Sequence, residues 1–423
     1  MTASGAPGAS RLERLAEENG FGVRRADGST FGAASAAFVV TLHSDRLPRV
    51  MAAGASPLRL GEAWIASDFD LEGDIFAAME TLHSLEAASP PAWLRVLGAM
   101  RRLLRPWRDA GRDISSHYDL PSAFFETFLD TRLVYTCAYY RHADAGLEQA
   151  QQDKLDLVCR KLRLAPGQSF LDLGCGWGAL ACWAAANYGV RAHGVTLSRE
   201  QADWAVAAVG RAGLGDRVTI EHGDYRHLPP GRRYDRIAAV GMIEHLGRAG
   251  HATLFGTVRS LLPGDGLFLN HGITMRGGAS WSSEMEFLHR YVFPGLDLVD
   301  AATTLQAMEA EGLEVLDVEN LRPHYARTTK DWATRLWARR AEASAIAGDR
   351  AWRTWVAYLA AASIAFRNGW IGLHQVVARP AGLRDDGVDP QLRDRIYAGA
   401  VTSVSGTSTT SARSPLRPAA RAR

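Results

Sequence analysis

The stretch of sequence that decides the fold is SFLDLGCGWG, at residues 169–178. Its first half is apolar and suits a buried strand, and its glycines come directly before a helical pattern that begins near Ala179. Glycine lets the backbone turn tightly and lets a ligand approach without interference from Cβ atoms. The stretch therefore predicts a strand, a glycine-rich turn and a helix that together bind a nucleotide-like cofactor.

Strands and helices alternate around this stretch. A helix is expected at residues 155–162, and strand candidates recur at residues 192–195, 218–220, 236–240, 266–269 and 313–316. Helical stretches separate most of these strands. The alternation predicts an α/β fold, with a mostly parallel, Rossmann-like sheet that has helices on both faces.

Three features favour S-adenosylmethionine (SAM) over a dinucleotide as the cofactor. The acid Asp172 stands just before the glycines, and GCGWG at 174–178 has the spacing Gly-x-Gly-x-Gly rather than Gly-x-Gly-x-x-Gly. The next strand ends in VTLS at 195–198, without the acid that holds the ribose in NAD sites. After a further strand, Asp224 and Tyr225 offer polar and aromatic groups for an adenine.

The composition excludes several classes of function. Formal net charge is +2, so the chain is no polycation, and we expect no nucleic-acid partner. The four cysteines form no Cys-x-x-Cys pair, so we expect no metal and free thiols in a reducing cytoplasm. No signal peptide is recognised, and no apolar run approaches the roughly 18 residues of a membrane span. We expect a cytoplasmic protein that meets a membrane only from its surface.

The order of several motifs resembles that of the cyclopropane-fatty-acyl-phospholipid synthases and mycolic acid cyclopropane synthases, a family of SAM-dependent methyltransferases. The similar region covers residues 115–380. Its motifs are HYDL at 117–120, YTCAYY at 135–140, GCGWG at 174–178, VTLS at 195–198, DYR at 224–226, VGMIEHLG at 240–247, YVFP at 291–294 and PHYA at 323–326. Residues 21–85 also resemble, less specifically, the extra N-terminal domain of the longer bacterial synthases.

The resemblance implies binding positions for two small molecules. With Asp172 added from the glycine motif, the expected SAM contacts are Tyr135, Thr136, Asp172, Gly174, Gly176, Thr196, Leu197, Gln201, Asp224 and Tyr225. The family's base resembles a bound bicarbonate, and the positions that would hold it match Cys137, Glu244, His271, Tyr325 and the backbone of Ile273. A buried anion needs hydrogen-bond donors, which His271 at a strand end and Tyr325 can provide. Glu244 can accept the proton of bicarbonate itself.

The resemblance also implies the chemistry. A methyl(ene) group passes from SAM to a cis double bond of an unsaturated phospholipid acyl chain. Attack leaves positive charge on a chain carbon, which aromatic faces suit, and deprotonation of this carbocation by bound bicarbonate closes a cyclopropane ring. Many family members carry a cysteine where Ala362 stands here, so a chemical role for that cysteine is excluded in this chain.

Other outcomes stay open. Proton loss from another carbon would give SAM-dependent methylenation of an oleoyl-type chain, and a reductase partner would complete a methyl-branched fatty acid. N-methylation of a small amine is a third activity for a related fold. A lipid-binding protein with a vestigial SAM site is disfavoured by the intact Gly174 and Gly176.

We expect the chain to divide into a flexible start at 1–20, an N-terminal lipid- or membrane-associated α+β domain at 21–110, the methyltransferase domain at 111–382 and a mostly disordered tail at 383–423. Residues 92–108 form a basic amphipathic pattern. Such a helix either lies on an anionic membrane surface or packs its apolar stripe on the core. We expect a protein peripheral to the inner face of the cell membrane, and a homodimer as one assembly, because some relatives dimerise.

Overall fold

The computed structural model describes residues 7–33, 35–52, 56–86, 120–229, 231–276, 283–292, 297–382 and 396–397. The chain divides into two units, Met1–Arg384 and Asp385–Arg423. The helix expected at 92–108 lies outside the described residues, as does the tail expected at 383–423 apart from Ile396 and Tyr397. Both stay predictions.

The first part of the chain is the small α+β arrangement that the sequence predicts. A four-stranded sheet has the order β2-β1-β3-β4, in which β1 and β3 are parallel and the other pairs antiparallel. Its elements are α1 (Pro7–Asn19), β1 (Gly22–Arg24), β2 (Thr30–Gly32), β3 (Phe38–Leu42), α2 (Arg46–Ala52), α3 (Pro57–Ile65), β4 (Phe69–Gly73) and α4 (Ile75–Glu86).

Helix α1 corrects one local expectation. A flexible start is expected over residues 1–20, but Pro7–Asn19 form a helix. Leu12 and Ala16, one turn apart, are buried at 3% and 0% exposure, and the amide of Phe21 donates to the carbonyl of Ala16. The apolar stripe is short, so it gives little periodic signal in the sequence. The division of the chain at residues 20, 110 and 382 stays a prediction.

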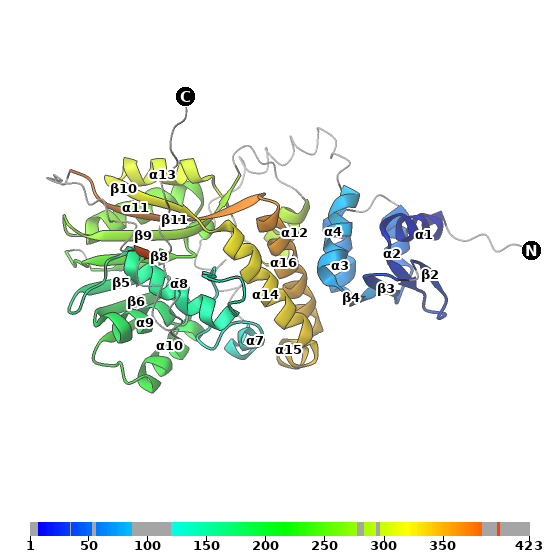
Figure 1. Cartoon of the computed structure of the whole chain (residues 1–423), viewed down its shortest axis with the longest axis horizontal. Coiled ribbons are helices and arrows are strands. Elements are labelled where there is room, and N and C mark those ends of the chain that lie inside the picture. Colours follow the sequence, from blue (N-terminus) through cyan, green and yellow to red (C-terminus); the bar gives the residue numbers. More distant parts are fainter. Residues whose placement is uncertain are drawn as a thin grey trace, which may run out of the picture. The chain divides into compact units, whose positions relative to one another are not determined.

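A seven-stranded sheet forms the larger part of the fold, with the order β10-β11-β9-β8-β5-β6-β7 (Figure 1). Strands β9, β8, β5, β6 and β7 are parallel, and β11 is antiparallel to both of its neighbours. The strands are β5 (Ser169–Leu173), β6 (Arg191–Thr196), β7 (Val218–His222), β8 (Arg236–Val240), β9 (Leu267–Met275), β10 (Leu313–Asn320) and β11 (Ile371–Pro380). The Rossmann-like α/β prediction is confirmed.

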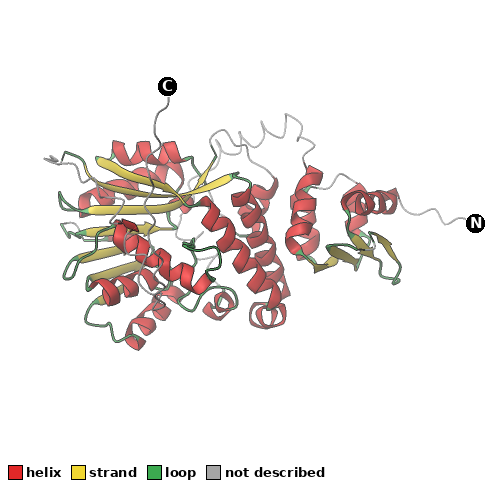
Figure 2. Cartoon of the chain, in the orientation of Figure 1, coloured by secondary structure: helices red, strands yellow, loops and turns green. Residues whose placement is uncertain are grey.

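Helices cover both faces of this sheet, as Figure 2 shows with strands in yellow and helices in red. Phe170 of β5 packs in a cluster with helices α8 and α9, whereas its neighbour Leu171 packs in a second cluster with α11 and α13. This alternation is the period of a pleated strand. The helices that flank or follow the strands are α8 (Leu147–Lys161), α9 (Ala179–Tyr188), α10 (Arg199–Arg211), α11 (Gly247–Leu261), α12 (Ser283–Tyr291) and α13 (Ala301–Ala310).

Two features of the sheet differ from the prediction. Strand β11 was not expected, because its run IGLHQVVARP shows no clean alternation; Gln375 and Ala378 are both fully buried between two neighbouring strands. Strand β9 is also longer than expected, since β11 pairs with it from Ile371 to Ala378. His271, expected at a strand end, therefore lies in the middle of β9.

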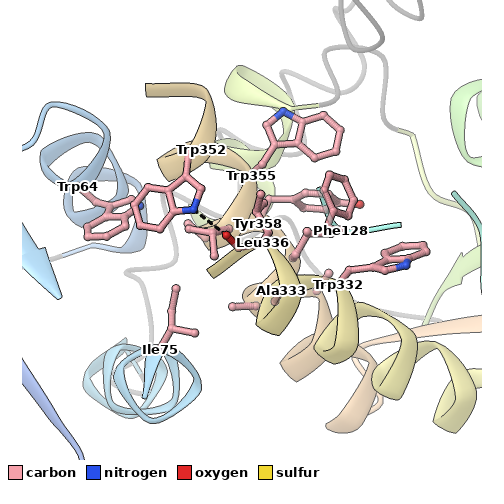
Figure 3. Close-up of a cluster of buried hydrophobic side chains, with 14 of the residues drawn as sticks. Trp64, Ile75, Phe128, Trp332, Ala333, Leu336, Trp352, Trp355 and Tyr358 are labelled. Carbon is pink, nitrogen blue, oxygen red and sulfur yellow. Dashed lines mark hydrogen bonds between the residues drawn. The ribbon is translucent and has the colours of Figure 1, made fainter. Parts of the chain in front are cut away.

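A third layer contains α7 (Ser122–Glu126), α14 (Arg322–Ala338), α15 (Arg340–Ala347) and α16 (Asp349–Arg367). Helix α16 is buried along most of its length. Figure 3 shows its aromatic side chains Trp352, Trp355 and Tyr358 within one apolar cluster, and the indole of Trp352 donates to the carbonyl of Leu336 at 3.0 Å. None of the described helices is both long enough and apolar enough to cross a membrane.

Arg353 ties α16 to the first part of the chain. Its side chain is 2% exposed, and its guanidinium pairs with Asp70 and Asp349. It also donates to the carbonyls of Trp64 at 3.3 Å and Phe69 at 3.1 Å, while the indole of Trp64 returns a hydrogen bond to the carbonyl of Arg353 at 2.9 Å. A buried guanidinium with this many partners fixes α16 against β4 and α3.

Replacing Arg353 with Met removes these hydrogen bonds and takes the buried cation away from the carboxylates of Asp70 and Asp349. We expect the free energy of unfolding, measured by urea titration, to fall by about 2 kcal/mol. Arg350→Met, which changes an exposed arginine of the same helix, is the control and should shift it by less than about 0.5 kcal/mol. Equal values for the two variants would show that Arg353 does not hold the two parts together.

Candidate active site

The carboxyl ends of β5, β6 and β7 meet at one edge of the sheet. The amide of Cys175, just after β5, donates to the carbonyl of Val195 at 3.0 Å. The amide of Gly223, just after β7, donates to the carbonyl of Thr196 at 2.9 Å. The three turns that follow these strands are therefore neighbours. In open α/β sheets, ligands bind outside the carboxyl ends of the strands.

The glycine turn has the open backbone that a cofactor needs. Gly174, Gly176 and Gly178 have φ angles of 68°, 54° and 79°, in the left-handed region that favours glycine. A Cβ atom on Gly176 would meet nothing within 4 Å, whereas one on Gly174 would lie 2.9 Å from the sulfur of Met242. Gly176 thus leaves space for a ligand at the turn. Gly174 allows the segment after β8, which contains Met242, to pack closely against the turn.

The second turn is held by its own polar side chains. The hydroxyl of Thr196 donates to the side-chain carbonyl of Gln201 at 2.9 Å, and Ser198 caps α10 by accepting from the amide of Gln201. The carbonyl of Leu197 contacts Nε2 of His222 at 3.1 Å. Thr196 and Gln201 are buried and point into the turn, so they shape this edge from within.

The third turn places an acid and an aromatic side by side, as predicted. Asp224 caps the short helix η1 (Tyr225–His227) and pairs with Arg226, which together hold the pKa of its carboxyl below the usual value, against the opposing effect of partial burial. Tyr225 is 7% exposed, and burial raises the pKa of its hydroxyl to about 12. Its ring is therefore a neutral apolar surface near neutral pH.

Asp172 lies inside the core. It is 2% exposed and points to the face of the sheet under α8 and α9. Burial raises the pKa of its carboxyl to about 7, against the lowering effects of Lys154 and of a hydrogen bond from the backbone of Ala181. The structure thus shows Asp172 supporting the start of α9, and its predicted contact with the cofactor stays a prediction.

The segment Tyr135–Cys137 crosses the same face of the sheet. The side-chain amide of Gln151 donates to the carbonyl of Thr136 at 2.8 Å, and the ammonium of Lys154 donates to the hydroxyl of Thr136 at 2.9 Å. Cys137 is fully buried, and its thiol lies 3.2 Å from the carbonyl of Ala138. Burial raises the pKa of this thiol above its usual value, so it stays protonated. All four cysteines are free, as predicted.

Glu244 lies beside β9, where β8 has ended. It belongs to the short helix η2 (Ile243–His245), and the backbone of Ile273 gives a hydrogen bond to its carboxyl group. Burial raises the pKa of Glu244 to about 7. Its Oε2 atom is buried and makes no hydrogen bond within the described residues. A Cβ atom on Gly272 would lie 2.2 Å from Ile243 and 3.4 Å from that oxygen, so glycine is needed at this position.

His271 is held by the strand that the sequence did not predict. Gln375 of β11 lies opposite it, and the amide nitrogen of Gln375 is 3.0 Å from its Nδ1. With the amide donating to Nδ1, the neutral ring carries its proton on Nε2. That atom is buried and makes no hydrogen bond within the described residues. Burial lowers the pKa of His271 well below the usual value, so the ring is neutral.

Aromatic side chains border this region. The hydroxyl of Tyr135 donates to that of Tyr358 at 3.3 Å, and the charge of Glu244 affects the pKa of Tyr358, which burial raises to about 12. Tyr325 is 7% exposed and stacks on Phe366 with ring centroids 4.5 Å apart. Four further rings surround Tyr135: Phe125 of α7, Phe128 just after that helix, Trp332 of α14 and Trp355 of α16.

The two unpaired polar atoms suit a small anion. Oε2 of Glu244 can accept a hydrogen bond, and Nε2 of His271 can donate one. The amide of Gly241 donates to the carbonyl of His271 at 2.8 Å, and this bond holds the segment that carries Glu244 against β9. Buried polar atoms are rarely left without partners, so a bound polar group is the expected occupant. Bicarbonate, with acceptor oxygens and one hydroxyl, matches this set of atoms.

The sheet order and the glycine-rich edge are those expected of a SAM-dependent methyltransferase with a Rossmann-like fold, and the comparisons with known proteins agree. A sequence profile of the mycolic acid cyclopropane synthetase family matches residues 107–376, and the chain belongs to this family.

A probable fatty acid methyltransferase of Pseudomonas putida is 41% identical over 334 residues, which are 76% of this chain and 82% of the relative. One from Mycobacterium tuberculosis is 35% identical over 393 residues, 85% of this chain and 91% of the relative. The crystal structure of mycolic acid cyclopropane synthase CmaA1 complexed with SAH and CTAB covers 64% of this chain and 99% of its own, with a TM-score of 0.61 and 31% identity.

Sequence reasoning missed the residues that support the site. Gln375 lies on the unpredicted strand β11, and nothing in its neighbourhood marks it. Lys154 could have been noticed, because the chain has only three lysines among many arginines. His245 was left outside the catalytic set; it is half-buried, and burial lowers the pKa of its ring to about 4.

The raised pKa of Glu244 predicts a pH dependence of stability. Between its ordinary value of 4.5 and its folded value of about 7, the folded protein keeps a proton that the unfolded chain has lost. Stability therefore falls as pH rises through this window. Glu244→Gln removes this contribution, so relative to wild type the variant should gain stability from pH 5 to pH 8, by about 3 kcal/mol at most.

Chemical denaturation at several pH values measures this difference. Glu309→Gln, which removes an exposed carboxyl of α13, controls for the loss of one negative charge. A constant difference between Glu244→Gln and wild type across the window would contradict the burial of a protonated Glu244.

Proposed function

We propose that the protein transfers a methyl(ene) group from SAM to a cis double bond in an unsaturated phospholipid acyl chain and forms a cyclopropane ring. The observation that carries the proposal is the pair of unpaired buried atoms, Glu244 Oε2 and His271 Nε2, beside one stretch of β9. They lie in a chain of the mycolic acid cyclopropane synthetase family.

The edge formed by the three turns would hold SAM. Gly174 and Gly176 leave the backbone open, Thr196, Leu197 and Gln201 form the second turn, and Asp224 and Tyr225 follow the third strand. Tyr135 and Thr136 approach from the segment before α8. A carboxylate and a tyrosine ring at the end of β7 suit the polar and apolar parts of an adenosine.

The gap beside β9 would hold bicarbonate, with Glu244, His271, the backbone of Ile273, Tyr325 and Cys137 around it. When bound, SAM supplies the methyl group and bicarbonate supplies the base. His271 donates from Nε2 because Gln375 occupies Nδ1. Glu244, with a pKa near neutrality, can take up a proton without a large energetic cost. Cys137 acts as a neutral thiol, because burial disfavours its thiolate.

The aromatic cluster would serve the substrate. Methyl transfer to an alkene leaves positive charge on an acyl carbon, and ring faces stabilise a cation while they exclude water. The ring of Tyr135 lies 5.2 Å from that of Trp332 and 5.8 Å from that of Trp355, and Figure 3 shows Trp332, Trp355 and Tyr358 in the same cluster.

A second product is favoured by one observation. The relatives that share 41% and 35% identity are named probable fatty acid methyltransferases, whereas a cyclopropane mycolic acid synthase shares 34% over a smaller part of the chain. Loss of a proton from a different carbon would give a methylene-branched chain from an oleoyl-type substrate. The same site would serve both outcomes, and the position of the base relative to the acyl chain would decide between them.

Expression in cells rich in oleate, with a labelled methyl donor and mass spectrometry of total fatty acids, tests the proposal. We expect a labelled product that is heavier by one CH₂ and retains no double bond. Glu244→Gln should lower its yield on the order of a hundredfold or more, because a positioned base contributes about that much. A labelled product that keeps a double bond would show that the protein catalyses methylenation and not cyclopropanation. Absence of labelled lipid from wild-type cells would contradict both.

We further propose that the protein works in the cytoplasm at the inner face of the membrane, with residues 92–108 on an anionic lipid surface. These residues lie outside the described ones, and the support is their basic amphipathic sequence. Replacing Arg101, Arg102 and Arg105 with Glu should sharply reduce sedimentation with anionic liposomes and spare binding of SAM. Unchanged sedimentation would refute membrane attachment by this segment. A homodimer stays an expectation.

A further inference from the structure

Lys154 is a buried cation directly beneath the site. It lies on α8 and is 2% exposed. Its ammonium donates to the hydroxyl of Thr136 at 2.9 Å, and within the described residues it forms no ion pair with a carboxylate. Burying an ammonium without a charged partner is costly, so a protein rarely retains one unless its charge is used.

Two acids lie near Lys154, and neither forms an ion pair with it within the described residues. Asp130 and Asp172 are both buried near it, and burial raises the pKa of each carboxyl, that of Asp172 to about 7. Near neutral pH the negative charge of Asp172 is therefore incomplete. Burial also lowers the pKa of Lys154, to about 8, and the ammonium remains the main form at pH 7.

A short chain of contacts joins Lys154 to the anion-binding atoms. The methyl group of Thr136 is 3.1 Å from where a Cβ atom of Gly241 would lie, and the amide of Gly241 donates to the carbonyl of His271 at 2.8 Å. His271 and Asp172 belong to strand positions that face α8, because they alternate with residues packed against α11. The positive charge of Lys154 also lowers the pKa of His271, after the larger effect of burial, and that of Lys161 adds a further lowering effect.

We propose that Lys154 is a positioning residue: it provides the positive countercharge for the anion held by Glu244 and His271, and it fixes Thr136 beside that anion. The inference rests on the proposed function, because it concerns the same site. It assigns to α8 the electrostatic part of anion binding, while Glu244, His271 and the backbone of Ile273 provide the hydrogen bonds. Removal of the charge should weaken anion binding more than binding of SAM.

Lys161 offers a matched control. It lies two turns further along α8 and is 1% exposed, but its ammonium pairs with the carboxylate of Glu319. Its charge is thus already matched by a carboxylate. Lys161→Met removes a buried lysine from the same helix, so it reproduces the loss of packing and of positive charge but leaves the ammonium beneath Thr136 in place.

The experiment measures the melting temperature of the full chain against sodium bicarbonate, without SAM or lipid, with sodium chloride at matched pH and ionic strength as the reference. Wild type and Lys161→Met should gain stability with bicarbonate. Lys154→Met should bind SAM but need roughly tenfold more bicarbonate, or more, for the same rise. Lys154→Arg should restore part of the response.

The outcomes separate this inference from the proposed function. If bicarbonate raises the melting temperature of Lys154→Met as much as that of wild type, and wild type modifies lipid, the role of Lys154 is overturned but the proposed function is not. No bicarbonate response and no labelled lipid from wild type would overturn the proposed function, and this inference with it. If Lys154→Met does not fold, Lys154→Gln keeps a donor for Thr136 without the charge. It must then lose the bicarbonate response for the inference to stand.

Discussion

The early end of β8 is the constraint on which the site depends. Val240 is the last residue of β8 and lies opposite His271, and Gly241 turns away with a φ angle of 76° while its amide still donates to His271. Strand β9 continues to Met275 without a parallel neighbour on that side, since β11 supports it from the other. The backbone of Ile273 is thereby freed to bind the carboxyl of Glu244. If β8 continued to pair with β9, the backbone of Ile273 could not bind this carboxyl group.

The aromatic layer around α16 joins this site to the rest of the protein. Tyr358 of α16 contacts Tyr135 at the site. One to two turns earlier on the same helix, Trp352 packs against Trp64, and Arg353 pairs with Asp70 of the first part of the chain. One helix therefore carries both the wall of the site and the contact with the small N-terminal sheet. A rigid α16 would keep the rings in place around a reacting acyl chain, where displacement by even one ångström slows reactions.

The sequence predicts most of the frame because the frame follows from short-range patterns. Apolar runs mark the strands β5 to β10, and the glycines at 174–178 mark the cofactor edge. The anion site follows only from the family resemblance, because Glu244 and His271 are distant in sequence and neither carries a local signal. Gln375 was missed with its strand, which is buried on both faces and so lacks alternation. Lys154 was missed because a lysine in an amphipathic helix is normally expected to face solvent.

The proposed function depends on a small anion bound between Oε2 of Glu244 and Nε2 of His271. A crystal structure of the chain with S-adenosylhomocysteine and bicarbonate tests this most directly. We expect planar, three-cornered density within hydrogen-bond distance of both atoms, absent when bicarbonate is withheld. Direct contact of Glu244 with His271, or the same water-like density under both conditions, would contradict it.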